Sequence, residues 1–376
     1  MEIIESENIH NDDMNKLVLE MNNCDTSFVN SIRRTILTNI KTLVFRGFPH
    51  NENKIKFIKN VTNYHNEYLK QRLSCIPIHY NEIDDFNTII KDYYVLLKVE
   101  NSGQEKKLVT TDDFKIIKKS TQKETTFSKH NLFPKDPKTK DPIVICYLNP
   151  QVSQNDPVQE IEAHLEFSVG TAKEDSCWNV VSKCLFYNSP DEQKIETYKE
   201  TIDEEKKKDF EILDSQRHFL KDHFVFHIET LGIYSNKDII IMASNHLVDY
   251  FKQIKIETKK INNFRRSYNQ SVYYENMINI FKDDKKTHNV FILRLENEDY
   301  TVGKLIEKYL FNHRVENDES NMNYVTFNKT HPHNDYSYVN IIYNEEENED
   351  KIILEDLLFI YDKIIYDFQY LIKVMS

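Results

Sequence analysis

Residues 25–40 read DTSFVNSIRRTILTNI, and this stretch decides the fold. Its first three residues carry the short side-chain oxygens that cap helices. Apolar residues then recur at helical spacing, within about 120° of one another on a helical wheel. These residues are Phe28, Val29, Ile32, Ile36 and Ile40. Because Asn30, Arg34 and Thr38 lie on the opposite side, the pattern predicts an amphipathic helix that buries its apolar stripe.

A second apolar seam occupies the end of the chain. Its residues follow one another at spacings of four, three, four, four and three, which is close to a heptad repeat. They are Ile353, Leu357, Ile360, Ile364, Phe368 and Leu371. A long helix with such a seam must bury it, either in the core of its own domain or against another helix. The same two possibilities are open for the stripe on residues 28–40.

Between these two helices the chain reads as two successive α+β units. Its 376 residues suggest two or three domains, at about 150 residues for each. We assign residues 1–50 and 215–285 to a first unit and residues 286–376 to a second. Residues 51–214 are expected to form a large, mainly-β inserted domain, in which the polar stretch 115–142 is an exposed loop.

Composition excludes several classes of function. Lys and Arg number 49 against 61 Asp and Glu, a net charge of −12, so the chain lacks the basic surface of a general nucleic-acid coat protein. Its five glycines are widely separated, whereas phosphate-binding loops need two or three within about eight residues. The pair Gly303-Lys304 ends like such a loop but lacks the first glycine. Nucleotide-binding enzymes of these classes are therefore excluded.

No metal or cofactor site is expected. The five cysteines form no C-x-x-C pair, which argues against a zinc ribbon or an iron–sulfur site. His331, His333 and Asp335 have a spacing that could hold a metal, but Pro332 makes a turn the better explanation. The odd cysteine count and the absence of an apolar leader indicate a reducing, intracellular setting. The longest apolar runs, such as 143–148, are far shorter than the roughly 18 residues that span a membrane.

Four stretches, in order, resemble one family. Residues 27–37 (SFVNSIRRTIL) resemble the N-A-L-R-R helix of the alpha-like assembly subunits of DNA-directed RNA polymerases. These include the bacterial alpha subunit, the archaeal D subunit and the third-largest subunit of eukaryotic polymerase II. Residues 67–78 (EYLKQRLSCIPI) are similar to the family's R-L-G-x-I-P-L stretch, with Ser74 in place of the glycine. Residues 167–175 resemble its F-x-x-G-x-G-K-E-H block, and residues 226–232 resemble its returning strand.

The C-terminal part resembles the smaller partner in that family, the archaeal L subunit or eukaryotic eleventh subunit. Residues 298–306 (EDYTVGKLI) are similar to its E-D-H-T-L-G-N-L-I segment, and residues 330–333 approximate its P-H-P turn. Partners that are separate chains in cells would here be fused, a layout seen among large DNA viruses. The resemblance thus implies an α+β fold with two alpha-like dimerisation units forming a pseudo-dimer, the first interrupted by the inserted domain.

The resemblance also implies a function. The chain would be a non-catalytic assembly scaffold of a multisubunit DNA-directed RNA polymerase, with no cofactor of its own and with the catalytic Mg²⁺ in the largest subunit. Asn30, Arg33 and Arg34 would dock the second-largest subunit, since guanidinium groups suit bidentate contacts with carboxylates. The two halves would pair through Phe28, Ile32, Ile36, Ile40, Ile353, Leu357, Ile360, Ile364 and Phe368.

The implied partners are the largest and second-largest polymerase subunits and a small assembly subunit. DNA would be contacted only indirectly, no membrane would be involved, and no homo-oligomer would be needed. The setting would be intracellular, and for a viral chain it would be the host cytoplasm and the virion. The alternative is an acidic intracellular adaptor that binds another protein through the helix at residues 28–40. A soluble hydrolase has no nucleophile–base arrangement to support it.

Overall fold

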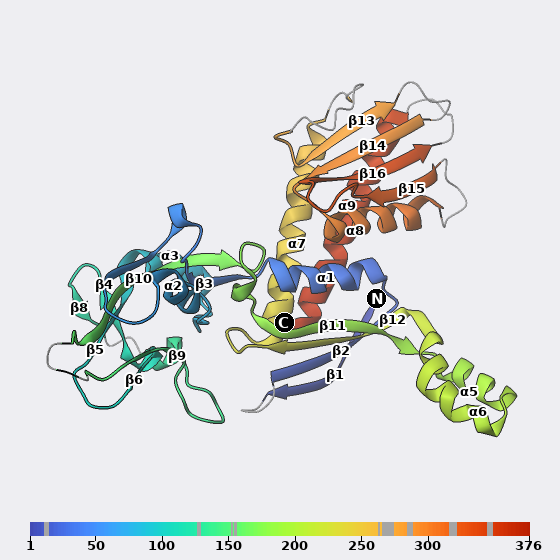
Figure 1. Cartoon of the computed structure of the whole chain (residues 1–376). Coiled ribbons are helices and arrows are strands. Elements are labelled where there is room, and N and C mark those ends of the chain that lie inside the picture. Colours follow the sequence, from blue (N-terminus) through green and yellow to red (C-terminus); the bar gives the residue numbers. More distant parts are fainter. Residues whose placement is uncertain are drawn as a thin grey trace.

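The computed structural model describes residues 1–10, 15–125, 129–151, 153, 156–261, 264, 274–283, 289–315, 322–343 and 349–376. Within these ranges the protein is a mixed α+β structure, which confirms the expected class. The described strands form two four-stranded antiparallel sheets, a six-stranded sheet and a two-stranded one. Figure 1 shows the two four-stranded sheets on either side of a group of long helices, with the other strands to one side.

The first four-stranded sheet has the order β1-β2-β12-β11. Its strands are β1 (Glu2–His10), β2 (Asn15–Asn22), β12 (Phe219–Thr230) and β11 (Val181–Pro190). In β2, alternation places Leu17, Leu19 and Met21 in the core. Phe224, Phe226 and Ile228 of β12 are buried in the same way. One face of this sheet therefore lies against the helices.

The second four-stranded sheet has the order β13-β14-β16-β15. Its strands are β13 (Ile278–Asp283), β14 (Asn289–Glu296), β16 (Tyr336–Tyr343) and β15 (Met322–Asn328). Phe291, Leu293 and Leu295 alternate along β14 and are fully buried. This sheet also turns one apolar face toward the helices, in the upper part of Figure 1.

Four helices lie between these sheets. They are α1 (Thr26–Thr38), α7 (Asn236–Lys259), α8 (Tyr300–Leu310) and α9 (Glu349–Met375). Helix α1 begins where the Asp25 carboxylate accepts a hydrogen bond from the Ser27 N–H at 2.8 Å. Helix α8 begins in the same way, with the Asp299 carboxylate accepting from the Thr301 N–H at 3.0 Å. A π-helical turn, Phe311–Val315, continues α8.

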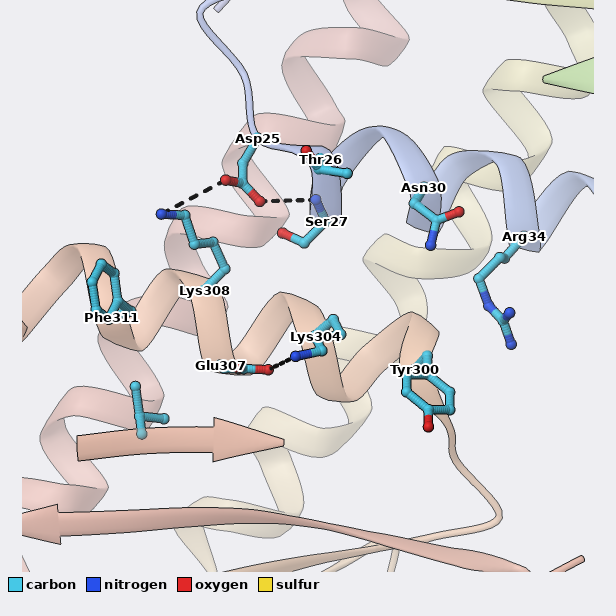
Figure 2. A pocket seen from close by; sticks show the side chains of 11 residues that line it. Asp25, Thr26, Ser27, Asn30, Arg34, Tyr300, Lys304, Glu307, Lys308 and Phe311 are labelled. Carbon is cyan, nitrogen blue, oxygen red and sulfur yellow. Dashed lines mark hydrogen bonds and ion pairs between the residues drawn. The ribbon is translucent and has the colours of Figure 1, made fainter. Parts of the chain in front are cut away.

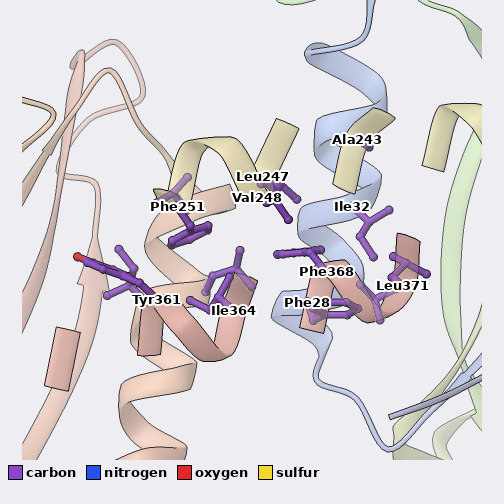
Figure 3. Packing of buried hydrophobic residues seen from close by; sticks show 14 of the residues in the cluster. Phe28, Ile32, Ala243, Leu247, Val248, Phe251, Tyr361, Ile364, Phe368 and Leu371 are labelled. Atoms are coloured by element: carbon purple, nitrogen blue, oxygen red, sulfur yellow. The ribbon is translucent and has the colours of Figure 1, made fainter. Parts of the chain in front are cut away.

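One apolar core joins the two four-stranded sheets through these helices. Phe28 of α1, Phe251 of α7 and Tyr361 and Phe368 of α9 are buried in it. Figure 3 shows side chains of α1, α7 and α9 meeting in this cluster. The Phe251 and Tyr361 rings lie 5.9 Å apart, and Lys255 of α7 pairs with Asp362 of α9 near by. Helices α7 and α9 thus pack along each other, which ties the two sheets together.

A separate core lies in residues 41–171. Its six-stranded sheet contains β3 (Lys41–Phe45), β10 (Gln159–Thr171), β5 (Tyr93–Asn101), β7 (Phe114–Lys118), β8 (Lys123–Glu124) and β4 (Ile55–Asn60). Strands β6 (Lys107–Thr110) and β9 (Val144–Leu148) pair beside it, and its helices are α2 (Asn66–Ser74), α3 (Phe86–Asp92) and α4 (Lys129–Leu132). Phe45 lies within 6.1 Å of Phe114, Phe133 and Phe167, measured between ring centroids. These aromatic side chains form the centre of this second core.

Two short helices project from the first sheet. Helices α5 (Glu192–Thr201) and α6 (Glu204–Asp209) lie between β11 and β12, and Figure 1 shows them extending away from the rest of the protein. Most of their side chains are charged, as expected for a solvated helical segment. Among the described helices, none is both long and apolar enough to cross a bilayer.

The observed sheets correct the expected boundaries between units. Strand β3 was expected in the first unit at residues 1–50, but it pairs with β10 in the six-stranded sheet. Strand β11 falls inside the expected range 51–214, yet it pairs with β12 in the first sheet. Strand β13 was expected with residues 215–285, yet it pairs with β14 in the second sheet. Each change reflects cross-strand pairing between distant residues, which local patterns do not reveal. The expected boundary at residues 285 and 286 falls outside the described residues.

Candidate functional site

The stripe on α1 and the seam on α9 lie in one cluster. Each residue named for the pairing of the two halves is buried in the core that joins the four-stranded sheets: Phe28, Ile32, Ile36, Ile40, Ile353, Leu357, Ile360, Ile364 and Phe368. The Phe28 and Phe368 rings stack, with centroids 4.6 Å apart and an interplanar angle of 21°. Figure 3 shows Phe28 and Ile32 of α1 beside Phe368 and Leu371 of α9. The structure thus brings the first and the last helix of the chain into direct contact.

The outer sides of α1 and α8 form a groove, which we call the α1–α8 groove. Its volume is about 680 Å³, and its walls are Asp25, Thr26, Ser27, Asn30, Arg34, Tyr300, Lys304, Glu307, Lys308, Phe311 and Val325. Figure 2 shows the two helices side by side, with Asp25 and Lys308 at one end and Arg34 and Tyr300 at the other. Charged groups of both signs and two aromatic rings face this space. Such a lining suits a protein segment better than a small apolar ligand.

Arg34 holds one end of the groove closed. One of its terminal nitrogens, Nη2, lies 2.5 Å from Asp299 Oδ2, and its Nε donates to Thr301 Oγ1 at 2.8 Å. The two charged side chains are 31% and 38% exposed, so water screens the pair only in part. The pKa of Asp299 is lowered despite its partial burial, since the Thr301 N–H and the Arg34 charge both favour the carboxylate. Arg34 therefore joins α1 to the start of α8.

This geometry corrects the expectation that Arg34 serves docking alone. The helical wheel places Arg34 opposite the apolar stripe, but that side of α1 is where α8 packs. The arginine thus contributes to contact within the chain. A single-helix pattern cannot show this, because Asp299 lies 265 residues away in the sequence.

Arg33 and Asn30 occupy a different part of the helix surface. The Arg33 Nε donates to Asn30 Oδ1 at 3.1 Å, and both residues are partly exposed. Burial raises the pKa of the Cys184 thiol on β11 to about 12, and the nearby Arg33 charge opposes that shift. Arg33 therefore lies between α1 and the edge strand β11, where it remains accessible to a partner.

The other end of the groove is closed by a second ion pair. Lys308 Nζ lies 3.7 Å from Asp25 Oδ2, and Lys304 Nζ pairs with Glu307 Oε2 at 2.6 Å on α8 itself. Figure 2 shows both pairs. Each helix-capping aspartate is thus paired with a basic residue of the other helix.

The histidines considered as metal ligands take part in a turn. The His333 N–H donates to His331 Nδ1 at 3.2 Å, and the Asn334 N–H donates to the His331 carbonyl at 3.1 Å. Across the part of the chain that the structure describes, no group of three or more His, Cys, Asp and Glu side chains is arranged to hold a metal ion. The turn therefore accounts for the spacing of these histidines.

Comparison with known proteins assigns the family. Residues 18–251, more than half of the chain, match the RNA polymerase Rpb3/Rpb11 dimerisation domain. The chain belongs to this family. It is accordingly an alpha-like subunit of a DNA-directed RNA polymerase, with a role in assembly of the enzyme and in transcription, and with other polymerase subunits as partners. The family is of a non-catalytic, assembly type.

One curated relative is similar over a short segment only. A "Conjugation stage-specific protein" of Tetrahymena thermophila is 35% identical over 74 residues. The similar segment covers 20% of this chain and 22% of the relative. The chain therefore spans about a fifth of that protein.

Two features of the Rpb3/Rpb11-type surface escaped the sequence patterns. Gly303 of α8 lies against Phe327 of β15 so closely that a Cβ on the glycine would come within 2.0 Å of the ring. This glycine, which resembles the end of a phosphate-binding loop, therefore serves packing. The partner of Arg34 is the second feature. A signal for it was present in the sequence, since Asp299 precedes the first turn of α8 as Asp25 precedes that of α1.

A second pocket lies behind the Arg34–Asp299 pair. Its volume is about 640 Å³, and it is lined by the end of α1, by α7 and by the loops before α8 and β16. Burial raises the pKa of Glu298 in this pocket to about 7. Lys173 and Lys329 oppose that shift, whereas the neighbouring Asp299 adds to it. Glu298 thus lies at the junction of the two halves and titrates near neutral pH.

Proposed function

We propose that this chain carries both alpha-like halves of the polymerase platform, and that it acts as a non-catalytic scaffold on which the two largest subunits assemble. The observation that supports this proposal is the repetition of one topology. The first half has the order β1-β2-α1-β11-β12-α7, and the second has the order β13-β14-α8-β15-β16-α9. Their sheets, β1-β2-β12-β11 and β13-β14-β16-β15, have equivalent strand orders. A pseudo-dimer within one chain accounts for this repetition.

The contacts between α1 and α8 fit the same proposal. Arg34 is nine residues after the capping Asp25, and Lys308 is nine residues after the capping Asp299. Arg34 pairs with Asp299, and Lys308 pairs with Asp25. In a two-fold interface, residue i of one half contacts residue j of the other, and j contacts i in return. The two ion pairs follow this rule, so the helices are related as in a symmetric dimer.

Residues 41–171 take the place of a short loop in this scheme. They separate α1 from β11, whereas in the second half α8 is followed by a π-helical turn and then β15. They also have a hydrophobic cluster of their own. We propose that they form the inserted domain of the larger half, with revised boundaries near residues 41 and 171.

Fusion supports assembly by mass action. Two separate chains must first meet, whereas two linked halves pair at an effective concentration that can reach the millimolar range for short linkers. The linked halves then present a preformed surface to the largest and second-largest subunits. We place the contact with the second-largest subunit on Arg33 and Asn30, since Arg34 is engaged within the chain.

The test is co-expression with the two largest subunits, followed by affinity purification and measurement of the dissociation constant for the second-largest. Arg33→Ala should weaken this binding by about thirtyfold or more, because a buried carboxylate of the partner would lose its charge partner. Arg217→Ala is the matched control, since Arg217 is 80% exposed and lies beside the α5–α6 projection. The control variant should bind as the unmodified chain does.

Two outcomes would contradict this proposal. Purification of the chain without either large subunit would favour the acidic adaptor that binds through α1. Binding of the second-largest subunit to the Arg33→Ala variant at full affinity would place the docking surface elsewhere. We further propose an intracellular setting and a viral source, host cytoplasm and virion included, since fusion of the two halves is a layout of large DNA viruses.

A further inference from the structure

Two of the five cysteines lie next to each other although about a hundred residues separate them in the sequence. Cys75 ends helix α2, where its N–H donates to the Gln71 carbonyl at 3.1 Å. Cys177 lies in the 3-10 turn Ser176–Trp178, between β10 and β11. The two side chains are within hydrogen-bonding contact of each other, and both are free thiols. The pair therefore bridges the inserted region and the chain that returns to the first sheet.

The backbone around this thiol pair is held in place from both sides. The carbonyl of Ser74 accepts hydrogen bonds from the Cys177 thiol at 3.8 Å and from the Trp178 indole N–H at 3.2 Å. The Trp178 ring in turn covers Gly170, where a Cβ would come within 2.5 Å of the indole. The Arg46 guanidinium stacks on the other part of this indole, 4.7 Å from the ring centroid. These contacts fix the 3-10 turn against the end of α2, so the two sulfurs stay close.

The two thiols differ in reactivity. Cys75 is exposed to solvent, so an oxidant can reach its sulfur directly. Cys177 is half-buried, and burial together with the Asp175 carboxylate raises the pKa of its thiol well above the ordinary value. Since sulfur attacks a peroxide as the thiolate, the exposed cysteine reacts first and the half-buried one resolves it.

We propose that Cys75 and Cys177 form a reversible disulfide when the protein meets hydrogen peroxide. In the first step the Cys75 sulfur attacks the peroxide, the O–O bond breaks, and a sulfenic acid and one water are formed. In the second step the Cys177 sulfur attacks the sulfenic sulfur, and the S–S bond forms as a second water leaves. The two thiols lose two electrons and the peroxide gains them. A dithiol reductant reverses the reaction.

The bond would join α2 to the turn before β11 and close a loop that contains most of the inserted region. Such a crosslink restricts the unfolded chain, so it should raise the thermal unfolding midpoint. This inference does not depend on the proposed assembly function. A polymerase scaffold and an adaptor would both contain the same thiol pair.

The experiment uses the full chain, reduced, freed of reductant and treated with a small excess of hydrogen peroxide. Peptide mass spectrometry without reduction should find the Cys75 and Cys177 peptides linked, with a loss of two hydrogens. Titration of thiols in the denatured protein should show two fewer than the five of the untreated chain. Dithiothreitol should restore all five. The unfolding midpoint should rise on oxidation and fall back on reduction.

Three variants separate the proposed reaction from general oxidation. In Cys177→Ser, Cys75 should accumulate as the sulfenic acid, which dimedone traps. In Cys75→Ser, neither the linked peptide nor the trapped acid should form. Cys184→Ser, which removes a half-buried thiol on β11, should give the linked peptide as before. A crosslink between other cysteines, or lasting sulfenic acid at Cys75 in the unmodified chain, would overturn the proposal.

Discussion

Replacing Phe28 and Phe368 by leucine, singly and together, measures how strongly the first and the last helix depend on each other. The two rings stack at 4.6 Å in the core between the four-stranded sheets, and neither is exposed by more than 2%. Leucine keeps each site apolar but removes the aromatic contact. Each single variant should therefore remain folded, with a loss of about 1–2 kcal/mol in the free energy of unfolding.

The coupling between the two changes carries the information. A stacked aromatic pair is worth about 0.5–1.5 kcal/mol beyond the area that it buries. Once one ring is gone, removal of the second can no longer lose this contact. The double variant should therefore lose less than the sum of the single losses, by about 0.5–1.5 kcal/mol.

Urea unfolding followed by circular dichroism gives the four free energies of this cycle. A second cycle, with Phe114→Leu and Phe368→Leu, is the control. Phe114 packs against Phe133 in the other core, with ring centroids 5.0 Å apart. Its loss should add to that of Phe368 within about 0.5 kcal/mol. If the Phe28 and Phe368 losses were additive as well, the two helices would not share one core and the reasoning would be refuted.

Three further predictions concern single sites. Gly303→Ala should cost about 1–3 kcal/mol or more in thermal unfolding, since its Cβ would overlap the Phe327 ring. Glu298→Gln should remove a loss of stability that the unmodified chain shows between pH 4.5 and pH 7, because burial raises the pKa of Glu298 to about 7 in the folded state only. Asp356→Ala should cost about 2–4 kcal/mol, because buried Asp356 accepts hydrogen bonds from Arg314 at 2.9 Å and 2.5 Å and from a buried tyrosine hydroxyl.

Each of these predictions has its own control. Gly103→Ala should be far milder than Gly303→Ala, because the nearest atom to its Cβ would be a side-chain oxygen at 3.2 Å. For Glu298, the folded state holds the proton more tightly than the unfolded chain, so its contribution is complete below pH 4.5 and lost as the pH rises through 7. Parallel melting curves of the two proteins across this range would show that another group is responsible. An Asp356→Ala variant as stable as the unmodified chain would show that water replaces the carboxylate.

Local periodicity made the helices predictable. The apolar residues of α1 and α9 recur at helical spacing, and the alternation in β2 and β12 follows the period of a strand. The expected polar loop at residues 115–142 was wrong at its start. Strand β7 (Phe114–Lys118) lies there, and Ile116 is buried although lysines surround it. Two lysines on the outer face of a strand lower its mean polarity signal without changing its fold.

Contacts between distant segments could not be predicted in this way. The register that pairs Phe167 with Phe45, and so places β3 in the six-stranded sheet, depends on the whole path of the chain. The same holds for Arg34 with Asp299 and for Cys75 with Cys177. Each residue of these pairs has an ordinary local explanation, as a helix-surface charge, a helix cap or a lone thiol. Only the folded topology gives it a partner.

The two-fold relation between α1 and α8 leads to a last prediction, about which end of the scaffold each large subunit recognises. At equivalent positions after the capping aspartates, Arg33 of α1 corresponds to Glu307 of α8. Equivalent surfaces therefore carry opposite charges, so a partner that fits one is repelled by the other. We expect Arg33→Glu to abolish binding of one large subunit and to leave the other bound, as judged by pull-down at moderate salt. Because Glu307 already pairs with Lys304 at 2.6 Å, Glu307→Gln should affect binding less than Arg33→Glu does. Loss of both large subunits in the Arg33→Glu variant, with the chain still folded, would mean that the charge difference does not distinguish them.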